Sequence, residues 1–141
     1  MTECIFCSIA AGDAPSHRVY EDDDVLAFLD VRPIMRGHTL VIPKQHAPIL
    51  GDLSADLAAR VFGVGQRLAT AVRRSDLAAD GANLVVNDGK SAFQTVAHTH
   101  LHVLPRQSGD KLRFVKVLIV RRNIDPEGTA AAIRSALQRT E

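Results

Sequence analysis

Aromatic side chains are scarce in this chain: of its 141 residues none is tryptophan, one is tyrosine and five are phenylalanine. Because single-stranded nucleic acids bind by stacking their bases on aromatic rings, no platform of that kind is predicted. Charge of one sign is also lacking, since 17 lysine and arginine residues balance 16 aspartate and glutamate residues. This balance gives no general attraction for nucleic acid or for an anionic membrane. Neither is expected as a partner, so an anionic ligand must be bound by local contacts.

Long apolar runs and cysteines are few as well. No stretch approaches the length of a membrane span, and the N-terminal residues lack the basic-then-apolar profile of a signal peptide. The expected location is therefore the cytoplasm, where thiols stay reduced. The two cysteines, Cys4 and Cys7, are spaced as Cys-x-x-Cys, which favours metal or redox chemistry over a structural disulfide. A chain of this length is expected to form one domain over residues 1–141.

The hydrophobic pattern predicts an α+β fold. A short helix is expected over residues 4–11, ending at Gly12, and strands over 17–21, 25–30, 38–43, 83–87 and from 98 to a stop at Pro105. Residues 112–120 are apolar and are expected to extend as a strand or to cover the sheet. Because the strands follow one another as hairpins rather than alternating with helices, the sheet should be largely antiparallel.

Two longer helices are predicted. Ser54 is the expected N-cap of the first, whose apolar residues recur at spacings of four and three: Leu53, Leu57, Val61, Val64, Leu68 and Val72. Gly63 and Gly65 inside it indicate the close approach of another element, for which a second subunit is one candidate. The second helix should begin at Asp125-Pro126-Glu127, the favoured order of cap, proline and acid.

Three histidines at alternate positions, His98, His100 and His102, form the predicted functional site. In an extended strand alternate side chains share one face, so the three imidazoles should project together. Packing does not explain such a set, because each buried imidazole needs its own hydrogen-bond partner. Two kinds of chemistry remain open: a transition metal bound by two or three of the rings, or a nucleophilic central histidine assisted by its neighbours.

The segment from His98 to Leu104, His-Thr-His-Leu-His-Val-Leu, resembles the signature of the histidine triad (HIT) superfamily of nucleotide hydrolases and transferases. The likeness continues in Asn87-Asp88-Gly89, in Asp30 after an apolar strand, and in the run from Gly37 to His46. It covers roughly residues 3 to 106, leaving 107–141 as a C-terminal extension. The preceding loop is most similar to the purine nucleoside phosphoramidase branch, although Phe93 replaces a glycine that is frequent there.

The resemblance implies that His100 attacks the α-phosphate of a nucleotide and forms a covalent nucleotidyl-histidine. A backbone carbonyl accepting from its other ring nitrogen would select the tautomer that attacks. The resemblance further assigns His102 to the phosphate and Asp30 to the ribose hydroxyls. It assigns phosphate or leaving-group contacts to Asn87, Gln94 and Thr95, and walls of the base site to Phe28, Leu29 and Val31. His17 and His38 receive no task and are expected to be structural or exposed.

The implied activity is a phosphoramidase that releases AMP. Two alternatives are a dinucleoside polyphosphate hydrolase of the diadenosine tetraphosphate type and a nucleotide-binding sensor with little turnover. A catalytic metal hydrolase that uses all three histidines is a further rival. No organic cofactor is expected.

The resemblance also implies a structural Zn²⁺ bound by Cys4, Cys7, His46 and His98, since bacterial members of the family carry such a set. Two reduced core cysteines without metal are the alternative. A homodimer is implied as well, and Gly63 and Gly65 are consistent with it.

Overall fold

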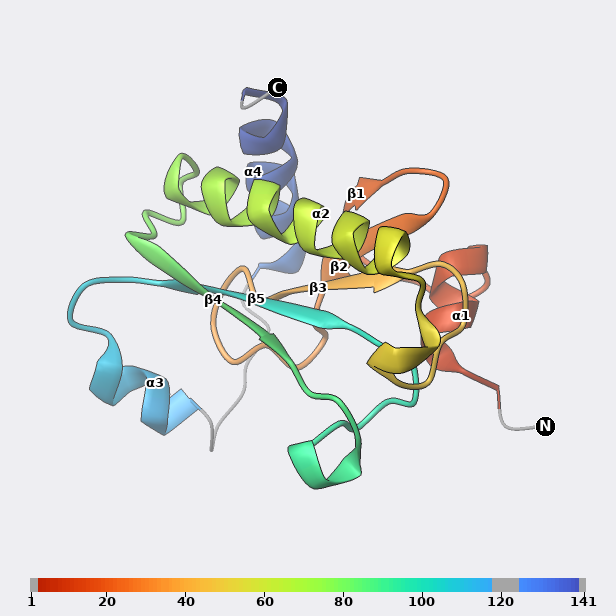
Figure 1. Ribbon diagram of the computed structural model, residues 1–141. Helices are drawn as coiled ribbons and strands as arrows, with labels where there is room; N and C mark the ends of the chain where they lie inside the picture. The colour runs from red at the N-terminus through yellow and green to blue at the C-terminus, as the bar shows by residue number, and fades with distance from the viewer. Residues whose placement is uncertain (1–2, 118–124, 140–141) are drawn as a thin grey trace.

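The computed structural model describes residues 3–117 and 125–139 and has the predicted α+β architecture (Figure 1). Its five strands form one antiparallel sheet in the order β1-β2-β3-β5-β4. They are β1 (Arg18–Glu21), β2 (Val25–Leu29), β3 (Thr39–Pro43), β4 (Gly81–Val86) and β5 (Leu101–Arg106). The helices are α1 (Ile5–Ala11), α2 (Ala55–Arg73), α3 (Lys111–Val117) and α4 (Pro126–Arg139), with 3₁₀ turns η1 (Leu50–Asp52) and η2 (Lys90–Ala92).

The two faces of the sheet have different cover. Alternate residues of a strand point to opposite faces, and in β2 the odd and even positions belong to two separate apolar clusters. α2 and α4 pack on the larger cluster, through residues such as Leu68 and Ile133. α1 packs on the other face, where Phe6 and Ile9 contact Phe28 and neighbouring strand residues. Leu40 belongs to the cluster on the α1 face and is paired with His102 across β3 and β5, so the side chain of His102 also lies on the α1 face.

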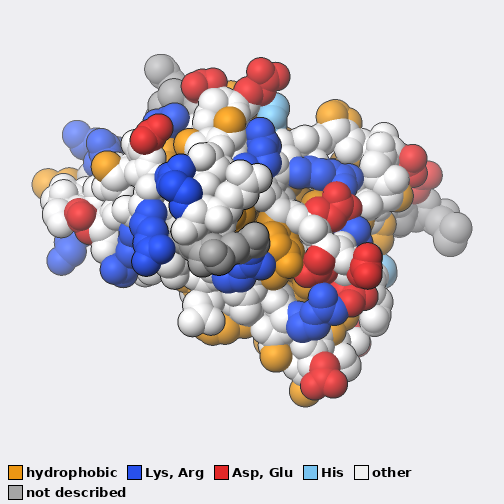
Figure 2. All heavy atoms as spheres, turned by 90° about the horizontal axis from the view of Figure 1, so that it is seen from above, with side chains coloured by type: hydrophobic (Ala, Val, Ile, Leu, Met, Phe, Trp, Pro, Cys, Tyr) orange, Lys and Arg blue, Asp and Glu red, His pale blue; other side chains and the backbone are white. Residues whose placement is uncertain are grey.

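Seen from above Figure 1, where α2 and α4 lie, the surface carries basic and acidic side chains side by side (Figure 2). Arg60 of α2 contacts both Asp22 and Asp24 at the β1–β2 turn, and Glu21 pairs with Arg18 and Lys44. This mixture agrees with the net charge of +1. Among the described residues, no helix is long and apolar enough to span a membrane.

The long helix begins as predicted. Ser54 is its N-cap, and its hydroxyl accepts a hydrogen bond from the backbone N–H of Leu57. Gly65 lies directly against β5, because a Cβ at this position would overlap the side chain of Leu101. The chain's own sheet therefore accounts for Gly65, whereas a Cβ at Gly63 would meet nothing within 4 Å.

Residues 111–117 form helix α3, so the strand predicted over 112–120 is wrong for its described part; residues 118–120 lie outside the described residues. Asp110 starts this helix, with its carbonyl accepting from the N–H of Phe114. Its carboxylate is held by Arg106, whose guanidinium also stacks over the Phe114 ring. Leu112 is 82 % exposed, so this segment does not cover the sheet either.

The boundaries of β5 also differ from the prediction. The strand runs through Pro105 to Arg106. The carbonyl of Arg106 accepts from the N–H of Asp80 on the β4 side, so the backbone nitrogen of Pro105 faces the β3 side. Pairing with β3 ends at Val103, and the missing N–H of Pro105 therefore interrupts no hydrogen bond between strands. The strand begins at Leu101 rather than His98, since Thr99 bonds through both its N–H and its hydroxyl to the carbonyl of Ala47 instead of a neighbouring strand. The predicted last helix is confirmed, with Ile133 and Leu137 buried.

Candidate functional site

His100 stands at the start of β5 with its ring held in one tautomer. Its Nδ1 lies 2.7 Å from the backbone carbonyl oxygen of His98. A carbonyl can only accept, so the proton must be on Nδ1, and the neutral ring keeps a lone pair on Nε2. This is the carbonyl contact that the sequence predicted for a nucleophilic imidazole. The side chain is buried, which shields this lone pair from bulk water.

His102 is oriented by a second histidine, His38. The N–H of Ile34 donates to Nδ1 of His38, which leaves the His38 proton on Nε2. That nitrogen lies 2.9 Å from Nδ1 of His102 and donates to it. With both rings neutral, His102 therefore carries its own proton on Nε2. The two rings of His100 and His102 lie 4.9 Å apart, so a lone pair and an N–H donor are offered side by side.

Asp30 lies at the end of this chain of contacts. Its Oδ2 is 3.6 Å from Nε2 of His38, and its Oδ1 accepts from the N–H of Arg32. Asp30, His38 and His102 have donor atoms close enough together to hold a cation. Because both nitrogens of His38 already make hydrogen bonds, to Ile34 and to His102, the arrangement is that of a hydrogen-bonded histidine pair with a carboxylate nearby rather than of a metal site.

Phe6 of α1 covers the nucleophilic histidine. Its ring centroid is 5.1 Å from that of His100 and 5.5 Å from that of Phe28, both in edge-to-face arrangement. It also lies 5.8 Å from the ring of His98. α1 thus supplies one wall of the site, next to the predicted base-site residue Phe28.

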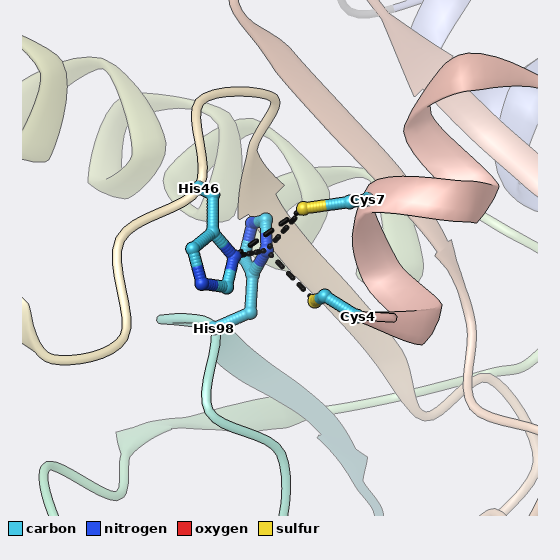
Figure 3. Close-up of side chains that lie close together, drawn as sticks. All are labelled: Cys4, Cys7, His46 and His98. Atoms are coloured by element: carbon cyan, nitrogen blue, oxygen red, sulfur yellow. Dashed lines mark hydrogen bonds between the residues drawn. The ribbon is translucent and has the colours of Figure 1, made fainter. Parts of the chain in front are cut away.

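The three histidines of the triplet do not converge on one metal ion. Within the described residues no group of possible ligands contains all three, and His98 and His102 belong to separate groups. Nδ1 of His98 instead joins a second cluster with Cys4, Cys7 and His46 (Figure 3). A catalytic metal bound by the whole triplet is therefore not supported.

This second cluster has the dimensions of a tetrahedral zinc site. Nδ1 of His46 and Nδ1 of His98 are 3.3 Å apart, and the Sγ atoms of Cys4 and Cys7 lie 3.4 and 3.6 Å from Nδ1 of His98. Zinc bonds of about 2.1 Å to nitrogen and about 2.3 Å to sulfur require separations of about 3.4 Å between nitrogens and about 3.6 Å between nitrogen and sulfur. Four ligands of the preferred type thus lie at the required spacing.

The hydrogen bonding of His98 also suits a metal ligand. Its Nε2 lies 2.8 Å from the carbonyl oxygen of Pro43 and must donate to it, which leaves the Nδ1 lone pair facing the two thiols. Burial lowers the pKa of His98, and the charges of His46 and His100 act in the same direction, so the ring is neutral near pH 7. In the metal-free cluster, burial and the adjacent Cys4 thiol raise the pKa of Cys7. A coordinated metal reverses that effect, since it deprotonates the thiols that bind it.

The remaining predicted contacts fall into two groups. Phe28 and Leu29 are buried on opposite faces of β2, whereas Val31 is 67 % exposed after the strand ends. The side chain of Gln94 bonds to backbone on both sides of its loop: it accepts from the N–H of Gly89 and donates to the carbonyls of Pro48 and Val96. In the structure Gln94 therefore closes the loop that carries Asn87, Phe93 and Thr95.

Phe93 occupies a backbone conformation that favours glycine. Its φ is +69°, and its side chain is 82 % exposed. The loop thus keeps the conformation expected of a glycine at this position, and the phenyl ring points into solvent rather than against the loop.

Comparison with known proteins agrees with this arrangement. The HIT-domain family model matches residues 11–109. A zinc-bound histidine triad family protein of Mycobacterium smegmatis has the same fold, with a TM-score of 0.90, 51% identity, and coverage of 98% of this chain and 95% of its own. The chain belongs to the histidine triad family.

Two further relatives are similar to this chain, and the name of one of them gives an activity. An uncharacterised HIT-like protein of Mycobacterium tuberculosis is 50% identical over 134 residues, covering 95% of this chain and 92% of its own. An adenosine 5′-monophosphoramidase of Schizosaccharomyces pombe is 37% identical over 103 residues, covering 73% of this chain and 74% of its own. The family includes nucleotide-binding proteins and nucleotide hydrolases.

Sequence reasoning missed two residues of this HIT site. His38 received no task, yet it is fully buried and orients His102. A signal was present, because His38, Leu40 and Ile42 alternate on the same face as the histidine triplet. Phe6 lies within the helix predicted over residues 4–11, but nothing in the sequence shows which strand residues this helix contacts.

Proposed function

We propose that this HIT protein is a nucleotide hydrolase or transferase that acts at an α-phosphate through a covalent nucleotidyl-histidine on His100. The observation that carries the proposal is the hydrogen bond from Nδ1 of His100 to the carbonyl of His98, which leaves the nucleophilic lone pair on Nε2. An imidazole of this kind is nucleophilic near neutral pH without a strong base. His102 would stabilise the phosphoryl oxygens through its Nε2–H.

The reaction would proceed in two displacements. Nε2 of His100 attacks the α-phosphorus, the bond from phosphorus to the leaving group breaks, and the leaving group departs with its electron pair and takes up a proton. Water then attacks the same phosphorus, and the bond to His100 breaks to release the nucleoside monophosphate. Binding without a nucleophile would require neither the fixed tautomer of His100 nor the chain from His38 to His102.

The preferred substrate is a purine nucleoside phosphoramidate, with AMP as product. This choice is supported by the likeness to the fission-yeast monophosphoramidase and by the loop from Asn87 to Thr95. In this proposal Asp30 binds the ribose hydroxyls. Phe28 and Val31 lie beside the base through their side chains, and Leu29 through its backbone, because its side chain faces α2 and α4. Asn87 and Thr95 serve the phosphate side, and Gln94 holds their loop in place. A dinucleoside polyphosphate hydrolase and a sensor with little turnover are the alternatives that the experiment below separates.

We further propose that Cys4, Cys7, His46 and His98 bind a structural Zn²⁺. The four donor atoms have tetrahedral spacing, and the Mycobacterium smegmatis relative is zinc-bound. The ion would tie α1 to the loop after β3 and to the residue that precedes the nucleophile. A reduced thiol pair of this kind suits the cytoplasm, which is the location we propose.

A homodimer is also proposed. β4 is an edge strand of the sheet, and an apolar groove beside it is lined by residues of the turn η1, of α2 and of the strands: Leu50, Leu53, Ala58, Val61, Phe62, Val86, Thr99 and Leu101. Phe62 is 58 % exposed at this groove. An open strand edge beside an apolar surface is suited to pairing with a second copy of the chain.

The first experiment measures AMP release from adenosine 5′-phosphoramidate and from diadenosine tetraphosphate, side by side, for the wild type and for His100→Ala. We expect faster release from the phosphoramidate and a loss of at least about a thousandfold in His100→Ala. Acid quenching during turnover should trap one nucleotidyl group on the wild type, detected by intact mass and absent from His100→Ala. His17→Ala, which alters a histidine outside the site, is the matched control and should retain activity.

Other results would change the assignment. Faster release from the dinucleotide would leave His100 as the proposed nucleophile and would change the proposed substrate to dinucleoside polyphosphates. Tight nucleotide binding with no turnover of either substrate would refute the enzyme proposal in favour of the sensor.

A further inference from the structure

Cys4, the N-cap of α1, and Cys7, within this helix, are close enough to form a disulfide. Their Sγ atoms belong to a group in which all ligand atoms lie within 4.8 Å of one another, and both thiols are free. Neither is deeply buried, and the neighbouring His46 is exposed. Small oxidants can therefore reach both sulfur atoms, and exposure together with thiolate character determines how readily a cysteine is oxidised.

We propose that Cys4 and Cys7 are a site of reversible oxidation, at which a hydroperoxide converts the zinc-binding thiolates into a disulfide, releases the metal and lowers nucleotide turnover. This inference rests on the proposed function of the zinc cluster and of His100. Neither the chemistry of phosphoryl transfer nor a purely structural metal requires it.

The oxidation is balanced with hydrogen peroxide as the oxidant. One thiolate attacks a peroxide oxygen, the O–O bond breaks, and a sulfenic acid and hydroxide are formed. The second thiolate attacks the sulfenic sulfur, the S–O bond breaks, and a second hydroxide leaves as the S–S bond forms. Two protons convert the hydroxides to water, so each disulfide consumes one peroxide and oxidises two thiolates by two electrons in total.

The disulfide is incompatible with the metal for two reasons. Two sulfur ligands of a tetrahedral zinc ion lie about 3.8 Å apart, whereas bonded sulfur atoms lie about 2.05 Å apart. In addition, the thiolate charges that bind the ion are consumed when the bond forms. Only His46 and His98 remain as ligands, and two imidazoles do not complete a structural zinc site.

His98 and Phe6 connect this cluster to the nucleophile. His98 faces the thiols through Nδ1, while its carbonyl accepts from Nδ1 of His100 at 2.7 Å. Cys4 and Cys7 flank Phe6 in sequence, and the Phe6 ring covers His100. Figure 3 shows Cys4 at the start of α1 and Cys7 within it, both facing His98. A movement of the His98 backbone would change the contact that fixes the tautomer of His100, and a movement of α1 would change the position of the ring that covers it.

The test uses the reduced, zinc-loaded full-length protein. Its zinc content and its AMP release from adenosine 5′-phosphoramidate are measured first, because absence of either already refutes the proposed function before any oxidant is added. Hydrogen peroxide is then added, and three quantities are followed: zinc released to a chromogenic chelator, intact mass with peptide mapping, and kcat/KM. Dithiothreitol and zinc are added at the end.

We expect one equivalent of zinc to be released as the mass falls by two hydrogen atoms and a Cys4–Cys7 disulfide peptide forms. The value of kcat/KM should fall at least about tenfold, as is typical when groups that orient a reactive ligand are lost. Reduction with added zinc should restore it. Cys7→His, which keeps four metal-binding side chains but cannot form the disulfide, should lose less of its own zinc and activity to the same peroxide dose.

Three results would overturn the inference. Zinc could stay bound while the wild type retains two titratable thiols after peroxide. The disulfide could form without any change in kcat/KM. The Cys7→His variant could lose zinc and activity as fast as the wild type, which would trace the loss to oxidation elsewhere in the chain.

Discussion

The position of single protons on the histidine rings decides what each residue of this site can do. The carbonyl of His98 places a proton on Nδ1 of His100, and the carbonyl of Pro43 places one on Nε2 of His98. Two chemically identical side chains therefore differ in which ring nitrogen keeps its lone pair: Nε2 of His100, the proposed nucleophile, and Nδ1 of His98, the proposed metal ligand. The backbone makes both assignments, so substitutions that leave it intact should preserve them.

His38 acts through His102, and its removal tests that role. His38→Leu removes the N–H that donates to Nδ1 of His102, and with it the contact that favours a proton on Nε2. We expect kcat to fall by about ten- to a hundredfold with little change in KM. The pH dependence of kcat should also shift, because a His102 ring in the other tautomer gains an N–H at Nε2 when it is protonated. Steady-state kinetics across pH 5–9 measures both.

His38→Gln is the matched variant, since its amide can still donate toward His102, and it should recover part of the loss. Thermal unfolding shows whether each variant is folded. A folded His38→Leu protein with wild-type kcat and pH profile would contradict the positioning role.

Helix α2 lies directly against the sheet at Gly65, a residue that has no side chain. Gly65 lies against Leu101, the residue between His100 and His102, while Gly63, two residues earlier, faces open space. The two glycines therefore differ in function even though the sequence presents them as a pair. Gly65 permits the packing that supports the face of β5 opposite the histidines.

This difference predicts opposite effects of the same substitution. Gly65→Ala gains about 1 kcal/mol of helix propensity but overpacks a buried contact at a cost of about 1–3 kcal/mol, so the free energy of unfolding should fall by about 1 kcal/mol. Gly63→Ala meets no atom and should raise it by up to about 1 kcal/mol. Urea unfolding of the two variants tests the prediction; equal stabilisation by both would disprove the close approach at Gly65.

For the whole molecule, helix α4 of the C-terminal extension belongs to the core. Thr129, Ala130, Ile133, Ala136 and Leu137 of α4 are buried, and all but Thr129 lie in one cluster with α2 and the sheet. The opposite side of the molecule ends in the edge strand β4 and the groove beside Phe62. The helical face on one side is thus covered within the chain, whereas no other strand of the described residues pairs with the outer edge of β4.

If a second copy covers that edge, a charge in the groove should prevent association. We expect the wild type to sediment as a dimer and Phe62→Asp as a monomer, because a carboxylate buried without a partner costs more than the interface contributes locally. Ala131→Asp, which places the same charge on the exposed face of α4, is the control and should remain dimeric. A wild-type protein that is monomeric at all concentrations in analytical ultracentrifugation would refute the homodimer.

The sequence alone determined the features that depend on residues close together in the chain. The succession of strands as hairpins predicted the α+β fold, and the cap at Ser54 with the periodicity of residues 57–72 predicted the long helix, because both depend on neighbouring residues. The alternation of His98, His100 and His102 singled out the histidine segment in the same way, and its role in catalysis stays a prediction. The resemblance to HIT proteins added the grouping of Cys4, Cys7, His46 and His98, which the structure brings together.

Only the tertiary structure decided the features that depend on distant residues. His38 and His102 meet because β3 and β5 are neighbours in the sheet, a pairing between segments 64 residues apart that no local pattern encodes. The same pairing ends before Pro105, which is why that proline does not stop β5. Residues 111–117 form a helix because Arg106 holds the Asp110 carboxylate and stacks on Phe114, and these contacts outweigh the strand preference of the apolar side chains.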